Sequence, residues 1–203
     1  DDWHAFRLDH FGASELVFAL GLSKKESRTG LLHAKKTGIA RQFSQWLQEN
    51  VLDRGHELEA SARPIVARLI GKKLYPSTYS IGKISASVDG LTADGSTAWE
   101  HKQYNKEYFD MVAAGEVPEE HMPQCQQVLM VTGADKLIFT ISDGTEENMV
   151  STEVLPCPEW FEKIRATWAQ FEIDLENYVP VQIAEKPIAD AITDLPALFV
   201  QAK

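Results

Sequence analysis

Residues 87–104 read SVDGLTADGSTAWEHKQY, and this stretch predicts a two-stranded hairpin at the centre of the fold. Apolar and polar residues alternate through residues 84–89, which is the period of a half-buried strand. A second strand is predicted over residues 97–104. Between them, Asp94 and Gly95 form a dipeptide that favours two-residue hairpin turns, so we expect the chain to reverse there.

This turn determines which side chains meet across the hairpin. Pairing outward from it sets Asp89 opposite Glu100 and Ser87 opposite Lys102, all on one face. Opposed side chains have Cβ atoms about 4.5 to 5.5 Å apart, and like charges at that distance are destabilising. Two carboxylates therefore need compensation, either from Lys102 alone in a surface ion cluster or from a divalent cation bound between them.

The other face of the hairpin is predicted to be apolar. Trp99 and His101 alternate with Glu100, so they point away from it, toward the side that Val88 occupies. His101 is therefore interpreted as a structural residue, although imidazole chemistry would suit a catalytic site.

A third acid lies upstream, in the stretch GHELEASAR at residues 55–63. Its helical period puts His56, Glu59 and Arg63 on one face, so that Glu59 can approach the sheet with a basic partner beside it. Glu59 is either an exposed helix carboxylate or a third member of the carboxylate site.

Composition indicates one cytosolic domain. The chain has 203 residues, 44% of them hydrophobic, which is enough for a substantial core. It has no apolar run of about 18 residues and no basic-then-apolar start, so neither a membrane span nor a signal peptide is predicted. Cys125 and Cys157 lie far apart and are interpreted as ordinary thiols. Residues 1–179 are expected to form the domain, and residues 180–203 a tail for subunit or partner contacts.

Charge is distributed unevenly along the chain. The formal net charge is −10, which argues against a protein that coats nucleic acid with its whole surface. Within residues 24–41, however, six basic residues face one acid, a net charge of +5: Lys24, Lys25, Arg28, Lys35, Lys36 and Arg41. This basic strip either attracts a polyanion to one groove or is a solvated loop and helix face.

The remaining pattern predicts an α/β fold. Strands are expected at residues 136–142 and 149–155, and the segment 24–36, which is polar and contains Gly30, is expected to be a mobile loop. Helices are expected at residues 13–20, 39–50, 53–70, from 107 onward, 120–131 and 160–178.

Together these residues carry a resemblance to a nuclease family. Asp89 followed by Glu100-His101-Lys102 resembles the PD-(D/E)xK motif, with Val88 where that superfamily often has proline. More specifically, the chain is similar to the phage-type alkaline exonucleases of the lambda exonuclease and YqaJ family. The resemblance rests on five stretches in order: WHAFRLDHFGASEL (3–16), GHELEASAR (55–63), SVDG (87–90), WEHK (99–102) and PQCQQVLMVTG (123–133).

The resemblance implies a restriction-endonuclease-like core, in which helices flank a mixed central sheet. It also implies a magnesium-dependent enzyme, with Mn²⁺ as a substitute, that hydrolyses one strand of linear double-stranded DNA from 5′ to 3′. Such enzymes act in phage recombination by single-strand annealing. The implied partners are double-stranded DNA ends, two further copies in a homotrimeric ring and a single-strand annealing protein. The implied location is the cytoplasm of a bacterial host.

The resemblance also assigns roles to residues of the catalytic centre. Asp89 and Glu100 would hold the metal, together with the main-chain carbonyl of His101 and with Glu59, directly or through a water. Lys102 would orient or help to deprotonate the attacking water and offset charge on the scissile phosphate. The remaining member of the centre is Gln124, which would support that lysine or water.

A second set of residues would form a pocket for a terminal 5′-phosphate. Arg7, Ser14 and Ser87 match the family positions for this pocket, and an arginine fork with two hydroxyls suits such an anion. For Ser14, a simple helix cap is the alternative.

Two other functions remain open from the sequence. One is a restriction- or repair-type DNA endonuclease on the same fold. The other is a non-catalytic DNA-binding module whose carboxylate cluster is a remnant.

Overall fold

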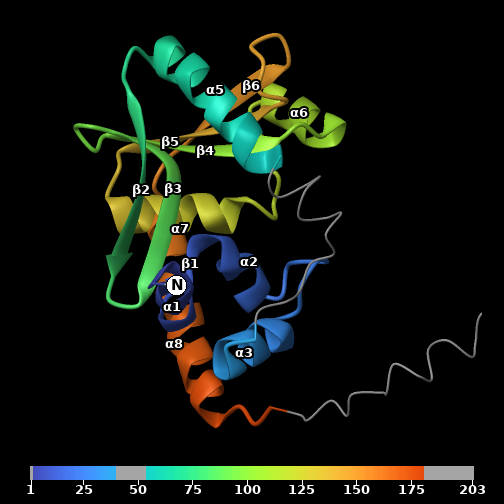
Figure 1. Ribbon diagram of the computed structural model, residues 1–203, viewed down its shortest axis with the longest axis vertical. Coiled ribbons are helices and arrows are strands. Elements are labelled where there is room, and N and C mark those ends of the chain that lie inside the picture. Colours follow the sequence, from blue (N-terminus) through green and yellow to red (C-terminus); the bar gives the residue numbers. More distant parts are fainter. Residues whose placement is uncertain (1, 40–53, 181–203) are drawn as a thin grey trace, which may run out of the picture.

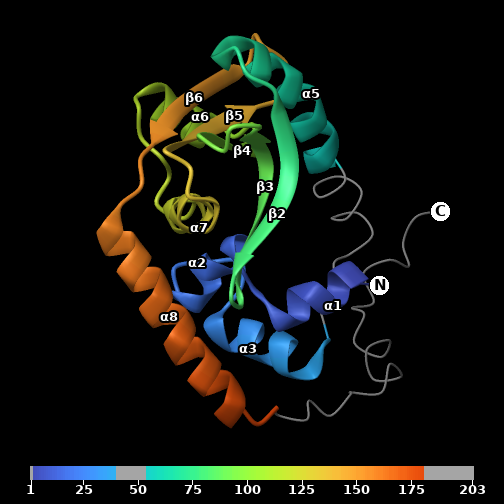
Figure 2. The same ribbon diagram turned by 90° about the vertical axis from the view of Figure 1, so that its left-hand side faces the viewer.

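Among the residues that the structure describes, six strands form one mixed sheet, and helices cover both of its faces (Figure 1, Figure 2). The computed structural model describes residues 2–39 and 54–180. The predicted α/β class, with a mixed central sheet flanked by helices, is confirmed. The predicted helix at 39–50 and the tail at 180–203 lie almost entirely outside the described residues.

The sheet has the strand order β1-β3-β4-β5-β6, and β2 pairs with β3. Neighbours are parallel in the pairs β1–β3 and β4–β5 and antiparallel in the other three pairs. The strands are β1 (Phe11–Gly12), β2 (Leu74–Ile81), β3 (Ile84–Thr92), β4 (Thr97–Gln103), β5 (Lys136–Ser142) and β6 (Met149–Val154).

The described helices agree with most of the predicted ones. α5 contains Pro64 within its span. None of the helices within residues 2–39 and 54–180 is long and apolar enough to cross a membrane. The helices are α1 (Asp2–Asp9), the 3-10 turn η1 (Ala13–Glu15), α2 (Leu16–Ala19), α3 (Arg28–Thr37), α5 (Arg54–Ile70), α6 (Lys106–Ala113), α7 (Met122–Thr132) and α8 (Pro158–Asn177).

Two hydrophobic cores lie on opposite faces of the sheet. The larger core gathers apolar side chains of α7 and α8 against the strands. The smaller core lies under α5, where Ala62 and Val66 pack with Trp99. In both ribbon views, α5 and α7 lie on opposite sides of β4 and β5 (Figure 1, Figure 2). A residue of β4 therefore contacts either α7 or α5, depending on its place in the alternation.

The register between β3 and β4 is the predicted one. Gly90 pairs with Trp99, and Leu91 pairs with Ala98. Trp99 and Ala98 accordingly join different cores. The face of the sheet to which each remaining side chain of β4 points is thereby fixed.

The turn of this hairpin is longer than predicted. Residues 93–96 connect the strands, and the amide of Gly95 donates to the carbonyl of Thr92 over 2.8 Å. The carboxylate of Asp94 accepts hydrogen bonds from Thr92 and Ser96, which holds Asp94 in the middle of the turn. The predicted two-residue turn is therefore wrong, but the register is kept because the longer connection is centred at the same place.

β3 contains a β-bulge directly after Val88. Along β2, Tyr75 pairs with Leu91 whereas Ser77 pairs with Val88, so two residues of β3 lie opposite a single residue of β2. These two residues are the Asp-Gly pair at 89–90. The extra residue shifts the alternation of every side chain beyond it.

The bulge changes the predicted faces of the hairpin. Val88 and Leu91 lie three positions apart, yet both belong to the larger core. Trp99 belongs to the smaller core on the other face. The prediction that Val88 shares a face with Trp99 is therefore wrong, because the inserted residue reverses the phase of the strand.

Gly90 is required by close packing at the bulge. A Cβ atom at this position would lie 2.8 Å from Leu74 Cβ and 3.2 Å from Trp99 Cε3. Gly90→Ala should therefore lower the free energy of unfolding by about 1 to 3 kcal/mol through overpacking. Urea denaturation measures this change. Ser80→Ala on the exposed side of β2 should stay within about 0.5 kcal/mol, and equal stabilities of the two variants would contradict the assignment.

Two segments differ from the sequence-based expectation. The segment predicted as a loop at 24–36 contains most of α3, whose start is capped by the Ser27 hydroxyl accepting from the Gly30 amide over 3.0 Å. Gly38, with φ 71°, ends the helix. β2 has no counterpart among the predicted elements, because only Leu74 in it is buried and no alternating pattern results.

Candidate active site

Glu100 and Lys102 lie on the face of the sheet that α7 covers. Lys102 Nζ is 2.7 Å from Glu100 Oε1, and Gln124 Nε2 on α7 donates to the same oxygen over 2.6 Å. The Glu100 side chain is only 2% exposed. Strand period correctly placed Glu100 and Lys102 on one face, and the fold adds Gln124 from a helix 24 residues further along the chain.

Asp89 also lies beside Glu100, but not through the strand pairing that the sequence predicts. The β3–β4 ladder ends at the Gly90–Trp99 pair, one pair short of the predicted Asp89–Glu100 pair. Instead, Asp89 Oδ2 accepts a hydrogen bond of 2.7 Å from the main-chain amide of His101. The bulge thus leaves the carboxylate of Asp89 between the two strands, next to Glu100.

α5 supplies the third acid together with a base. Glu59 forms an ion pair with Arg63 one helical turn later, as its spacing predicts. Arg63 Nε also donates to the main-chain carbonyl of Asp89 over 2.9 Å, and its guanidinium lies 6.0 Å from the centre of the Trp99 ring. Arg63 therefore links the helix that carries Glu59 to the strand that carries Asp89. His56 is exposed.

The electrostatics of the site are those of crowded, desolvated carboxylates. Burial raises the pKa of Asp89 well above its usual range, and the neighbouring charges of Glu100 and Glu59 add to the rise. Burial also raises the pKa of Glu100, although Lys102 opposes it. Both shifts mean that the folded chain holds negative charge here at a cost, which a cation would relieve.

Lys102 and His101 respond to the same surroundings in opposite directions. Burial lowers the pKa of Lys102, but the charges of Glu100 and Asp89 outweigh burial, and the net shift is upward. Lys102 is therefore a protonated hydrogen-bond donor at neutral pH. Burial, assisted by the charge of Lys102, lowers the pKa of His101 to about 4. The neutral His101 ring is hydrogen-bonded to Ser142 Oγ at 2.8 Å, which fits its predicted structural role.

One oxygen of the site has no protein partner. Glu100 Oε2 is buried and is without a hydrogen bond in the part of the chain that the structure describes. An unpaired buried acceptor costs about 1 to 3 kcal/mol, so such an atom needs a compensating role, and binding of a cation is one such role. Within residues 2–39 and 54–180, no group of three or more His, Cys, Asp or Glu side chains is placed to hold a metal ion. The donor set instead fits a cation that takes one or two carboxylates and keeps water ligands.

A pocket opens beside these carboxylates. Arg7, Ser14 and Ser87, which were grouped from the sequence, all line it. So does Gln124, whose amide also contacts Glu100. The pocket and the carboxylate cluster therefore share a wall.

The two hydroxyls of the pocket have different surroundings. Ser14 lies inside η1, and the helix start is formed by Gly12, whose amide donates to the Glu15 carboxylate over 2.9 Å. The alternative in which Ser14 caps this helix is thus wrong. Ser87 Oγ lies 3.0 Å from the hydroxyl of Thr78 on β2.

Several side chains of the predicted basic strip make contacts within the fold. Arg28 forms an ion pair of 2.6 Å with Asp174, and Lys36 donates to the carbonyls that end α8. Lys35 is 3% exposed and contacts Glu15. Arg41 lies outside the described residues. Arg28, Lys35 and Lys36 thus hold helices together, whereas Lys24 and Lys25 are exposed. The strip is therefore in part structural and in part a solvated face.

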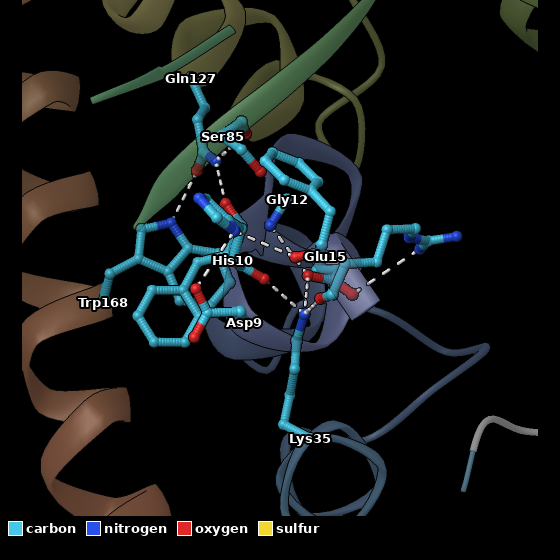
Figure 3. A network of polar contacts seen from close by, with 11 residues as sticks. Asp9, His10, Gly12, Glu15, Lys35, Ser85, Gln127 and Trp168 are labelled. Atoms are coloured by element: carbon cyan, nitrogen blue, oxygen red, sulfur yellow. Dashed lines mark hydrogen bonds and ion pairs between the residues drawn. The ribbon is translucent and has the colours of Figure 1, made fainter. Parts of the chain in front are cut away.

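Gln127 is a buried structural residue near the pocket, and sequence analysis assigned it no role. Its side chain is fully buried, and Nε2 donates to the carbonyls of Phe11 and Ser85, each over 2.8 Å. Its oxygen accepts from Trp168 Nε1 over 2.7 Å (Figure 3). Gln127 thus ties β1 to β3 behind the pocket. A glutamine three residues after Gln124 within an otherwise apolar helix was the available signal.

Comparison with known families gives one match to the sequence. The family described as the YqaJ-like viral recombinase domain matches residues 2–135. The match includes every candidate site residue named above. No curated protein matches the chain.

Two solved exonucleases have a fold similar to that of this chain. An alkaline exonuclease from Laribacter hongkongensis is 22% identical, with a TM-score of 0.71 over 87% of this chain and 92% of that one. Its complex with dAMP gives a TM-score of 0.72 over the same shares. A phage-related exonuclease from Haemophilus somnus 129PT is 13% identical, with a TM-score of 0.60 over 85% of this chain and 97% of that one.

Proposed function

Because the chain belongs to the family of YqaJ-like viral recombinase domains, we propose that it is a metal-dependent exonuclease that digests one strand of linear double-stranded DNA from its 5′ end. The observation that carries the proposal is the shared wall: Gln124 contacts the carboxylate cluster and also lines the pocket that contains Arg7. A terminal phosphate bound in that pocket would place a nearby phosphodiester bond at the carboxylates.

Magnesium is the proposed cofactor, and manganese is expected to substitute for it. Asp89 and Glu100 would hold the ion, with the main-chain carbonyl of His101 and, through a water, with Glu59. Support comes from the partnerless Glu100 Oε2 and from the raised pKa values of both acids. When bound, the ion would lower the pKa of a water ligand and neutralise charge on the phosphate.

Lys102 and Gln124 would act on the water and the phosphate. Lys102 is held as a cation 2.7 Å from Glu100 Oε1, so its ammonium can donate to the attacking water and offset negative charge that develops on the scissile phosphate. The Gln124 amide fixes the same Glu100 oxygen and thereby limits the positions that Lys102 can take. Glu100 Oε2 would then be the oxygen left to bind the cation.

The pocket would select the end of the DNA strand. A 5′-terminal phosphate carries up to two negative charges, whereas a phosphate within the strand carries one. Arg7 can bind it through parallel N–H donors, and Ser14 and Ser87 can donate hydroxyl hydrogen bonds. This arrangement gives a physical reason for digestion that starts at an end.

Arg7→Ala should remove the preference for phosphorylated ends. The wild-type protein should bind and degrade duplexes with 5′-phosphate ends at least about tenfold better than duplexes with 5′-hydroxyl ends, since a charge-assisted hydrogen bond contributes about 1.5 to 3 kcal/mol. In Arg7→Ala the two rates should be nearly equal. Release of nucleotides from end-labelled linear duplexes measures both. Equal rates for both kinds of end with the wild-type protein would refute the pocket assignment.

The same assay separates the two other functions. Cleavage of closed circular DNA would indicate an endonuclease of the restriction or repair type. DNA binding without metal-dependent degradation would indicate a non-catalytic binding module. Release of mononucleotides from linear duplexes, without cleavage of closed circular DNA, supports the exonuclease.

Assembly into a homotrimeric ring around DNA and transfer of the product strand to a single-strand annealing protein are further parts of the proposal. They rest on the family alone. Light scattering at several protein concentrations tests the trimer, and a monomer at every concentration would remove the ring. The role of residues 180–203 in such contacts is tested by comparing this mass with that of a chain truncated after residue 179.

A further inference from the structure

Glu15 places a buried negative charge in the wall of the pocket. The residue lines the pocket beside Ser14 and is 8% exposed. Its Oε2 accepts a hydrogen bond of 2.9 Å from the Gly12 amide (Figure 3). A carboxylate in this position would repel a phosphate, because little water is present to screen it. A pocket for an anion therefore requires that Glu15 be neutralised.

Lys35 provides that neutralisation from behind the pocket. Its side chain is 3% exposed, and Nζ lies 2.8 Å from Glu15 Oε2. The same ammonium donates to the carbonyls of Arg7 over 2.5 Å and of His10 over 2.6 Å. Figure 3 shows Lys35 extending from its helix to Glu15 and to the chain near His10. All three ammonium protons thus have oxygen partners, so this is a built position and not a chance surface pair.

Arg7 stands on the other side of the same carboxylate, at a longer distance. Its nearest nitrogen is 3.7 Å from Glu15 Oε1, which is too far for a hydrogen bond. The Arg7 side chain is 53% exposed, whereas Lys35 is 3% exposed. Glu15 is therefore bonded to the buried cation and only loosely attracted to the exposed one. Arg7 also lines the pocket, so its donors are available there.

We propose that Lys35 is a positioning residue that determines end specificity: by pairing with Glu15, it keeps the Arg7 guanidinium available to a terminal 5′-phosphate. This inference rests on the proposed function of the pocket. Without Lys35, Glu15 would have Arg7 as its remaining cation, because burying an unpaired carboxylate is costly. Arg7 would then close the gap of 3.7 Å and become the counter-ion of Glu15 in place of the phosphate.

The test compares binding to two duplexes that differ only in a 5′-phosphate or a 5′-hydroxyl group. Fluorescence anisotropy in chelator gives the ratio of the two dissociation constants without any hydrolysis. Lys35→Met should lower the preference for the phosphorylated end by about tenfold, which corresponds to one charge-assisted hydrogen bond. Lys36→Met is the matched control, because it removes a charge from the same helix but contacts α8, and it should keep the wild-type ratio.

The double variant Lys35→Met/Glu15→Gln separates positioning from folding. It buries no unpaired charge, and the glutamine oxygen can still accept from the Gly12 amide, so the chain should fold even where Lys35→Met alone is unstable. With no carboxylate to attract it, Arg7 should return to the pocket. The preference for the phosphorylated end should then recover to within about threefold of wild type.

The outcomes are distinct. Loss of the preference in Lys35→Met together with recovery in the double variant supports the inference. The inference is overturned if Lys35→Met keeps the wild-type preference for the phosphorylated end. It is also overturned if the double variant does not regain that preference. In either case, Arg7→Ala still tests the pocket assignment separately. If the wild-type protein itself binds both ends equally, the proposed function of the pocket has failed.

Discussion

Lys102→Ala is expected to slow DNA hydrolysis by about 10²- to 10⁴-fold while DNA binding in chelator changes by no more than about threefold. Lys102 is a protonated group within the carboxylate cluster, 2.7 Å from Glu100 Oε1. It would contact the water and the scissile phosphate only, so its loss should affect the reaction more than the binding of the strand. Single-turnover degradation of a labelled linear duplex measures the rate.

The control for this variant is Lys72→Ala. Lys72 is also paired with a carboxylate at 2.7 Å, that of Asp94, but the pair is about half exposed and lies at the hairpin turn. The rate of Lys72→Ala should therefore equal that of the wild type. Circular dichroism confirms that Lys102→Ala is folded. A folded Lys102→Ala protein that degrades DNA at the wild-type rate would exclude Lys102 from the chemistry.

Asp89→Asn is expected to abolish both metal binding and hydrolysis. In the wild-type protein, Mn²⁺ at about a hundred times its dissociation constant should stabilise the fold by about 2.7 kcal/mol, a rise of about 5 to 10 °C in melting temperature. Asparagine can keep the hydrogen bond from the His101 amide but removes a charge from the ligand set. The shift should therefore disappear, and hydrolysis should fall to the level of the wild type in chelator.

The same variant makes a second prediction of opposite sign. In chelator, Asp89→Asn should be at least as stable as the wild type, because it removes a desolvated charge next to Glu100. Asp110→Asn, at an exposed ion pair with Lys106, is the control and should leave the manganese shift unchanged. An unchanged shift in Asp89→Asn would show that the ion binds elsewhere.

The pairing of Glu100 with Lys102 could be predicted from local sequence because it depends on strand period alone. Glu100 and Lys102 are two residues apart in β4, and any strand places such residues on one face. The Glu59–Arg63 pair followed in the same way from helical period. These relations hold over a few residues and do not require knowledge of what packs against them.

Asp89 shows where local period stops being sufficient. Its position beside Glu100 depends on a bulge that is defined by the pairing of β3 with β2. β2 itself carries no apolar alternation, because it lies at an edge and is held by hydrogen bonds to its neighbour. Because the sequence pattern did not predict β2, the extra residue in β3 could not be located from the sequence.

The sequence by itself determined the α/β class, the hairpin register and the face that Glu100 and Lys102 share, since propensity and period act between near neighbours. Only the tertiary structure decided that Lys35 is buried against Glu15, that Gln124 joins two sites and that Arg7 faces a pocket. A charged side chain looks the same in sequence whether it is solvated or paired. Which of the two it becomes depends on desolvation and on partners brought from distant parts of the chain.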